Sequence, residues 1–336
     1  MSGYVLELLA MLLVILVAAE LFTNALEHLG ARLNISEGVT GSLFAAVGTA
    51  LPETMVPLLA VFGASVDAAV NEEIGVGSIL GAPLMLSTLS TGLMAVAVLG
   101  SRGLRGRISP EPAGLNRDLH FFIFAFLVAA AAMYVPHTQR LPRLGLSLLL
   151  VATYVAYIYL TMRASKDLVM EGHGTSAEER MFASRAGLPT NYFTIFGQLG
   201  VGLALLVFGA EGFIAGVQGV SQLLHISALL LSLLIIPIAT ELPEKVNSIL
   251  WVRRGKDTLA FGNITGAMVF QGTLLPAIGI LLTPWQPRIE VLSGVAVTLI
   301  AALWIRVGVR AQGVAVWALL LNAALYGAYL FITLAR

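Results

Sequence analysis

Two short stretches of this chain place a glutamate directly after a proline inside a hydrophobic run: residues 48–53 (Gly-Thr-Ala-Leu-Pro-Glu) and residues 239–244 (Ala-Thr-Glu-Leu-Pro-Glu). A charge at the middle of a bilayer costs roughly 2.5 to 3.5 kcal/mol and usually faces a bundle interior or watery cavity. Proline also frees backbone groups, which a membrane tolerates only where they face protein or water. A single glutamate of this kind could lie near a helix end and reach water. Because the motif occurs twice, we favour the interpretation that each copy contributes half of one cation site.

The two stretches belong to a repeated unit. The offset that superimposes Glu53 on Glu244 also superimposes Glu20 on Glu211. Glu20 and Glu211 are therefore expected inside the helix bundle, in gating or structural roles. A later pair of segments, 77–83 and 262–268, shares the pattern Gly-x-x-x-Gly-Ala. Small residues at this spacing let helices approach closely, and ordinary packing is the favoured interpretation of that pattern.

The composition is that of a membrane protein built from helices. The chain has 336 residues, of which 58% are hydrophobic and 11% charged, with a mean hydropathy of +0.89. Soluble domains carry about 25% charged residues. There is no cysteine, so disulfide and thiolate chemistry are excluded, and the net charge of zero indicates no nucleic-acid partner. The sequence indicates no cofactor, no obligatory protein partner and no ATP-binding Gly-x-x-x-x-Gly-Lys motif. The partners expected are the lipid bilayer and small inorganic cations.

Ten membrane-spanning helices are expected when about 20 apolar residues are assigned to each span. The second and seventh are predicted to be broken at their prolines, and the third at Gly81-Ala82-Pro83. The ten ranges are 4–26, 37–63, 74–99, 119–136, 143–163, 191–219, 227–252, 258–283, 287–309 and 313–334.

Most Lys and Arg residues outside these spans fall on one side of the membrane, which indicates the cytoplasm. Both termini are therefore predicted to be extracytoplasmic, in a multi-pass protein of the plasma (inner) membrane. Because five spans are an odd number, a repeated five-helix unit must enter from the opposite face. The chain is thus expected to hold inverted repeats at 1–163 and 191–336, joined by a cytoplasmic linker at 164–190. Secondary transporters are commonly built this way, with the site at discontinuous helices near the midplane.

The paired motifs resemble the two repeats of the calcium/cation antiporter superfamily, and most closely its sodium/calcium exchanger branch. The usual form there is Gly-Thr-Ser-x-Pro-Glu, and the resemblance covers nearly the whole chain. It implies a central cluster of cation sites in which Glu53 and Glu244 bind Ca²⁺, while Thr49 and Thr240 add carbonyl or hydroxyl oxygens. Calcium takes six to eight oxygen ligands, often from bidentate carboxylates.

The sequence departs from the family pattern at several of these ligand positions. The serine after the threonine is Ala50 in the first repeat and Glu241 in the second. The Asn or Asp expected in the third and eighth helices falls at Leu86 and Gln271. Glu241 and Gln271 are therefore added to the candidate ligands. Ser87, Thr88 and Thr273 are possible substitutes for the missing oxygens.

Lys245 lies four residues after Glu241, so the two side chains can meet on one helical face. One interpretation is a permanent ion pair that silences Glu241. Another is that the ammonium stands in for a bound cation, which would leave fewer sites and a proton- or single-ion-coupled exchange.

The function predicted is a secondary antiporter, not an enzyme, that exchanges Ca²⁺ or a similar divalent cation for Na⁺ or H⁺ by alternating access. The first and sixth helices are expected to slide across the rest. Two alternatives stay open: a cation-binding membrane protein whose pocket is locked by Lys245, and a proton-coupled exchanger of another cation. An intramembrane hydrolase with a carboxylate dyad is disfavoured, because it leaves the whole-chain repeat unexplained.

Overall fold

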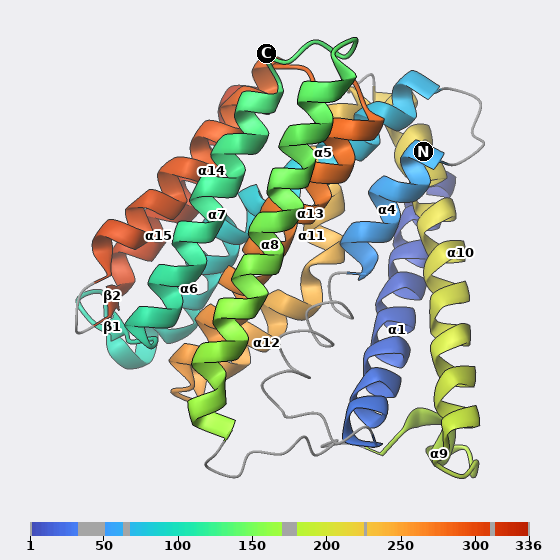
Figure 1. Cartoon of the computed structure of the whole chain (residues 1–336), viewed down its shortest axis with the longest axis vertical. Coiled ribbons are helices and arrows are strands. Elements are labelled where there is room, and N and C mark those ends of the chain that lie inside the picture. Colours follow the sequence, from blue (N-terminus) through green and yellow to red (C-terminus); the bar gives the residue numbers. More distant parts are fainter. Residues whose placement is uncertain are drawn as a thin grey trace. The chain divides into compact units, whose positions relative to one another are not determined.

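The computed structural model describes six stretches of the chain, and they are almost entirely helical (Figure 1). The described residues are 2–32, 51–62, 68–169, 180–224, 227–309 and 313–334. They form two compact units: Met1–Ala64 with Ile158–Ile226, and Ser65–Tyr157 with Ser227–Arg336. Each unit therefore combines segments from both halves of the sequence, as expected if the two halves are interwoven repeats.

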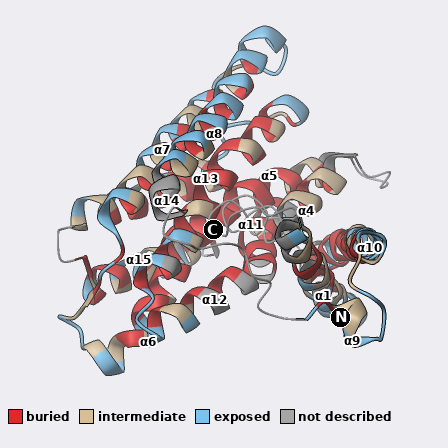
Figure 2. Cartoon of the chain, turned by 60° about the horizontal axis from the view of Figure 1, so that its bottom comes forward, coloured by how far each residue is buried: buried red, intermediate tan, exposed pale blue. Residues whose placement is uncertain are grey.

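The first unit is organised around two long helices, α1 (Ser2–Arg32) and α10 (Tyr192–Leu224), which lie side by side in Figures 1 and 2. Helix α4 (Leu51–Phe62) packs mainly on α10, and the single-turn α9 (Phe182–Arg185) contacts both long helices.

A stripe of glycines on α10 allows α1 to approach closely. A Cβ atom added at any of them would lie 2.3–3.2 Å from an atom of α1. The facing pairs are Gly202 with Phe22, Gly209 with Ile15, Gly212 with Met11, Gly216 with Leu8, and Gly219 with Tyr4. The two helices are antiparallel, because the later glycines face the earlier residues of α1. Glycines spaced three, four or seven residues apart lie on one helix face, so the stripe is a continuous contact surface.

The second unit contains the remaining helices. The N-terminal part of α8 (Arg140–Val169) belongs to it, and the part from Ile158 onward belongs to the first unit. The other elements are α5 (Ala68–Met85), π-helix η2 (Leu86–Ser90), α6 (Thr91–Arg102), α7 (Pro112–Ala132), α11 (Ala228–Thr240), α12 (Leu242–Arg253), α13 (Asp257–Leu282), α14 (Ile289–Gly308) and α15 (Val316–Leu334). Strands β1 (Arg107–Ile108) and β2 (Val314–Ala315) form a short antiparallel pair.

Helices α5 and α13 are central to the second unit, and α8 lies at its edge. In the apolar spans, 72% of the α5–α6 window and 78% of the α13 window are buried, against 22% in α8. Figure 2 shows the same contrast, with buried positions along α5 and exposed positions along α8. Because exposed residues of α8 are mostly apolar, that face suits lipid.

Helix α5 crosses α11 at two glycines. A Cβ atom at Gly77 would lie 1.9 Å from the Ser232 hydroxyl oxygen, and one at Gly81 would lie 2.4 Å from the Leu233 carbonyl oxygen. The first copy of the Gly-x-x-x-Gly-Ala pattern therefore serves close packing. In the second copy, a Cβ at Gly262 meets no atom within 4 Å among the described residues.

Seven helices among the described residues are long and apolar enough to cross a membrane, and Val316–Phe331 is a shorter apolar helix. The all-helical membrane fold is thus confirmed, while the count of ten spans stays a prediction. Helix α8 extends to Val169 and α9 also forms, so both described ends of the predicted linker 164–190 are partly helical.

The predicted break at Gly81-Ala82-Pro83 is wrong. Helix α5 continues through Pro83 to Met85, and the irregularity lies just beyond, in the π-helix η2. The close contact with α11 at Gly81 holds this part of α5 against its neighbour. The missing donor of Pro83 is accommodated within the helix, and the wider π-turn follows within one turn of it.

Candidate functional site

The seventh predicted span is broken at Glu241. Helix α11 ends at Thr240 and α12 begins at Leu242, with Glu241 between them at φ −89° and ψ 11°. Pro243 lies in the first turn of α12, where its missing N–H is tolerated. Thr240 is buried, and its hydroxyl donates to the Ile236 carbonyl oxygen at 3.1 Å. The predicted discontinuity of this span is confirmed beside Pro243, whereas α11 continues through Pro237, near which a break was also predicted.

Four polar side chains meet around this break, all of them almost completely buried. Glu241 and Gln271 are 0% exposed, Glu244 1% and Lys245 5%. Glu244, Lys245 and Gln271 all interact electrostatically with the Glu241 carboxylate. The structure therefore brings together the candidate ligands of the second repeat, in a setting where each unpaired polar group is costly.

Lys245 makes the strongest contacts in this cluster. Its Nζ donates to the Pro237 carbonyl oxygen at 2.9 Å and lies 3.3 Å from Oε2 of Glu241. Neither oxygen of Glu241 receives a hydrogen bond of normal geometry from the described residues, so the 3.3 Å contact is an ion pair of loose geometry. The two amide atoms of Gln271, which interacts with the Glu241 carboxylate, likewise make no hydrogen bond of normal geometry to the described residues.

Asn263 fixes the position of α12 against α13. Its Nδ2 donates to the Glu244 carbonyl oxygen and to the Ser248 hydroxyl, both at 3.0 Å. Asn263 belongs to the second Gly-x-x-x-Gly-Ala segment, which the sequence indicated only as a packing motif. Its first-repeat counterpart, Ser78, bonds within its own helix, to the Ile74 carbonyl at 2.7 Å.

Two of the first-repeat candidates cannot be placed in the site. Thr49 lies outside the described residues, and Glu53 lies in α4 with its side chain outside them. Glu20 and Glu211 are exposed on the first unit, where α1 and α10 bury their glycine-containing faces against each other. Their expected place inside the bundle stays a prediction.

The possible substitute ligands of the third and eighth helices are buried but bonded locally. The hydroxyls of Ser87 and Thr88 donate to the Leu84 carbonyl oxygen. The hydroxyl of Thr273 donates to the Val269 carbonyl oxygen at 2.6 Å. Such bonds to a preceding turn are usual for Ser and Thr in helices, so these hydroxyls are already engaged.

Asn322 and Asp118 are buried polar residues that the sequence analysis missed. Asn322 of α15 donates to the Ser87 carbonyl oxygen in η2 at 2.9 Å. Asp118 of α7 accepts bonds from the Thr265 hydroxyl at 2.7 Å and the Tyr157 hydroxyl at 3.1 Å, and so joins α7, α13 and α8. For Asn322 the available signal was a single polar residue within an apolar span, whereas Asp118 lies in a polar run just before the predicted span 119–136 and carried no such signal.

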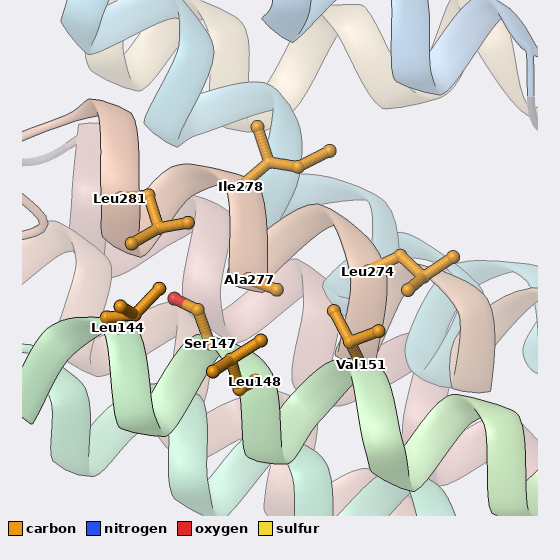
Figure 3. A pocket seen from close by; sticks show the side chains of 8 residues that line it. All are labelled: Leu144, Ser147, Leu148, Val151, Leu274, Ala277, Ile278 and Leu281. Atoms are coloured by element: carbon orange, nitrogen blue, oxygen red, sulfur yellow. The ribbon is translucent and has the colours of Figure 1, made fainter.

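A cavity of about 290 Å³ lies between α8 and α13 (Figure 3). It is lined by Leu144, Ser147, Leu148, Val151, Leu274, Ala277, Ile278 and Leu281. None of the candidate cation ligands whose side chains the structure describes contributes to it, and its apolar lining does not suit an ion. Among the described residues, no group of three or more His, Asp or Glu side chains is arranged to hold a metal ion.

Comparisons with known proteins agree with this architecture. The family model for sodium/calcium exchanger proteins matches residues 3–163 and 194–335. A curated relative, described as the putative antiporter CaxA of Alkalimonas amylolytica, is 26% identical over 277 residues, which cover 81% of this chain and 79% of that protein.

Two solved structures share the fold over nearly the whole chain. The H⁺/Ca²⁺ exchanger CAX superimposes with a TM-score of 0.71 at 18% identity, covering 99% of this chain and 87% of that one. The sodium-calcium exchanger NCX_Mj superimposes with a TM-score of 0.59 at 19% identity, covering 99% of both chains. Both are inverted-repeat transporters, so the predicted fold class is confirmed.

Proposed function

The chain belongs to the sodium/calcium exchanger family, and on that premise we propose that it exchanges Ca²⁺ or a similar divalent cation for Na⁺ or H⁺ across the membrane. The observation that carries the proposal is the helix break at Glu241. The carboxylates of Glu241 and Glu244 and the amide of Gln271 are buried there, within a helical membrane protein. Buried acidic groups within membranes mark ion pathways, and broken helices supply backbone carbonyl oxygens as further ligands.

In this proposal, Glu244 is the principal divalent-cation ligand of the second repeat. It is 1% exposed, and it lies in the first turn of α12, where the helix dipole favours an ionised carboxylate. Asn263 holds the backbone of this residue in place. Sequence symmetry supports the same role for Glu53 in the first repeat, with Thr49 and Thr240 lending oxygens. Gln271 adds a neutral amide oxygen.

We assign the moving part to the unit that contains α1 and α10. Alternating access requires one rigid body to move against another. The glycine stripe makes α1 and α10 a closely packed pair, and the chain separates into two compact units with this pair in one of them. The exposed positions of Glu20 and Glu211 fit polar contacts formed or released as this pair moves.

Radioactive Ca²⁺ uptake into liposomes that contain the purified protein tests the exchange. An outward gradient of Na⁺ or of H⁺ should drive uptake, and the gradient that drives it identifies the coupling ion. Glu244→Gln and Glu53→Gln should each lower uptake at least tenfold, which corresponds to about 1.4 kcal/mol of lost binding. Glu7→Gln removes an exposed carboxylate of α1 and is the matched control.

The proposal fails if neither gradient moves Ca²⁺ and both glutamine variants bind Ca²⁺ as the unmodified protein does. The buried pair of Lys245 and Glu241 favours one second candidate, a protein that binds a cation but is locked against exchange. In that case Ca²⁺ flux should appear only in Lys245→Met.

A further inference from the structure

Lys245 carries a charge into the centre of the candidate cation site. The residue is 5% exposed, and its ammonium contacts two oxygens: the backbone carbonyl of Pro237 at 2.9 Å and the carboxylate of Glu241 at 3.3 Å. Unwound backbone carbonyls and the C-terminal ends of half-helices coordinate Na⁺ in transporters with discontinuous helices. Here the Pro237 carbonyl is such an oxygen, and the Glu241 carboxylate adds a negative charge. The ammonium therefore has the charge and the ligands of a bound monovalent cation.

The helix end strengthens this correspondence. Pro237 lies in the last turn of α11, which ends at Thr240, so its carbonyl is at the negative end of the helix dipole. The backbone N–H of Glu241 reaches the same carbonyl at 3.3 Å, and the oxygen can accept the ammonium as well. A cation is favoured at this end of a helix whether it is an ion or a side chain.

The surrounding helices hold both sides of this position. A Cβ at Gly81 would lie 2.7 Å from Cγ of Pro237, so α5 packs directly on the turn that supplies the carbonyl. On the other side, Asn263 binds the Glu244 carbonyl and the Ser248 hydroxyl and holds α12. The oxygens that contact the ammonium are thus set by packing and not by Lys245 alone.

The pair is also incomplete as a purely structural ion pair. A closed structural bridge would satisfy the carboxylate with hydrogen bonds. Here both oxygens of Glu241 and both amide atoms of the nearby Gln271 lack a hydrogen-bond partner of normal geometry among the described residues. These oxygens remain as potential ligands for an ion, while Lys245 supplies one positive charge.

We propose that the ammonium of Lys245 permanently fills a monovalent-cation subsite of the transport site. This inference rests on the proposed cation exchange. Because Lys245 cancels the charge of Glu241, the second repeat presents the net charge of Glu244 alone. The protein should accordingly exchange with one monovalent cation fewer per Ca²⁺ than it would with that subsite open.

The test compares Lys245→Met with the double variant Glu241→Gln/Lys245→Met. The single variant opens the subsite and keeps its carboxylate, whereas the double variant removes both charges and preserves the net charge of the site. Binding of radioactive Na⁺ is measured on purified protein in alkaline choline buffer, which keeps the freed carboxyl ionised. The charge moved per Ca²⁺ is measured in liposomes whose membrane potential is set with K⁺ and valinomycin.

Lys245→Met should bind one Na⁺ more than the unmodified protein, and its charge movement per Ca²⁺ should shift by one elementary charge. The double variant should show neither change. The inference is overturned if charge movement in Lys245→Met is unchanged, or if the single and double variants bind the same amount of Na⁺.

Two further measurements keep the outcome decisive. If the unmodified protein transports no Ca²⁺, the exchange proposal fails, and the Na⁺-binding comparison alone decides the role of Lys245. If Lys245→Met does not give a monodisperse protein, Lys245→Ala is purified with propylammonium, which has the three carbons and the nitrogen that the truncation removes. Na⁺ should displace propylammonium from this variant, and a failure to compete would also overturn the inference.

Discussion

Arg102 and Asp257 form a bidentate ion pair, in which the two terminal guanidinium nitrogens each lie 2.7 Å from a different carboxylate oxygen. The pair joins the last residue of α6 to the first residue of α13. A second pair, Arg288 with Glu73, joins the residue before α14 to the early part of α5. The helical segment from α5 to α6 is thus joined by two ion pairs to α13 and the chain that follows it. The end of α6 pairs with the first residue of α13, and the early part of α5 pairs with Arg288, which follows α13 in the chain. Two ion pairs in equivalent positions are expected if the two halves of the chain are inverted repeats.

These two ties differ in burial, and a stability difference should follow. The side chains of Arg102 and Asp257 are 23% and 10% exposed, whereas Arg288 is 44% exposed. Arg102→Ala leaves the largely buried Asp257 without its ionic partner, although the Ser109 backbone N–H still donates to it at 2.7 Å, and should destabilise the protein by about 2 kcal/mol. Arg288→Ala removes an exposed pair and should cost less than about 1 kcal/mol. Thermal unfolding of both purified variants in detergent measures the difference, and equal losses would contradict it.

The crossing of α5 and α11 makes a second prediction. Gly81→Ala would place a methyl group 2.4 Å from the Leu233 carbonyl oxygen and 2.7 Å from the Pro237 ring. Relieving this overlap must separate two buried helices and should destabilise the protein by about 1 to 3 kcal/mol.

Gly81→Ala should also reduce Ca²⁺ transport, because the turn that it displaces supplies the Pro237 carbonyl to the site. Gly100→Ala is the control, since a Cβ there meets no atom of the described residues within 4 Å and alanine favours a helix. Unchanged thermal stability of Gly81→Ala would show that the two helices can separate without cost.

A third prediction concerns the support of Glu244. Asn263→Ala removes the amide that binds the Glu244 carbonyl and the Ser248 hydroxyl. The loss of two hydrogen bonds of about 1 kcal/mol each should loosen α12 and weaken Ca²⁺ binding about tenfold. The repeat offers the control Ser78→Ala, whose hydroxyl bonds within α5, to the Ile74 carbonyl oxygen at 2.7 Å. Calorimetric titration of both variants with Ca²⁺ measures the two affinities. Equal affinities would show that Asn263 does not support the site.

The sequence was sufficient to predict the fold class and the break of the seventh span beside Pro243. Charged residues and prolines in apolar runs are strong local signals, because the bilayer makes both costly. The meeting of Glu241 with Lys245 also followed from their spacing, which places them on one helical face.

Other features depend on tertiary packing, which local signals do not contain. Pro83 suggested a break, but contact with α11 keeps α5 helical and the irregularity lies in η2. Which faces of α1 and α10 pack together is set by the glycine stripe, and neither Glu20 nor Glu211 lies on that contact face. The role of Asn263 depends on how α12 lies against α13, and the sequence does not specify that contact.

The last prediction separates a ligand from a packing residue at Gln271. Its amide is 0% exposed and has no hydrogen-bond partner of normal geometry among the described residues, an arrangement that costs about 1 to 3 kcal/mol for each unsatisfied group. Gln271→Leu replaces this amide with an apolar side chain of similar size, so the variant should be as stable as the unmodified protein or more stable.

The same variant should bind Ca²⁺ about tenfold more weakly, because an oxygen ligand worth about 1.4 kcal/mol is lost. A rise in stability with a fall in affinity is the pattern expected when a protein keeps a buried polar group for function. Thr298→Val removes a buried hydroxyl that bonds within α14 at 2.8 Å, and should leave Ca²⁺ affinity unchanged. If Gln271→Leu loses stability and keeps its affinity, Gln271 is a packing residue, and the ligand set of the second repeat is limited to its carboxylates and backbone oxygens.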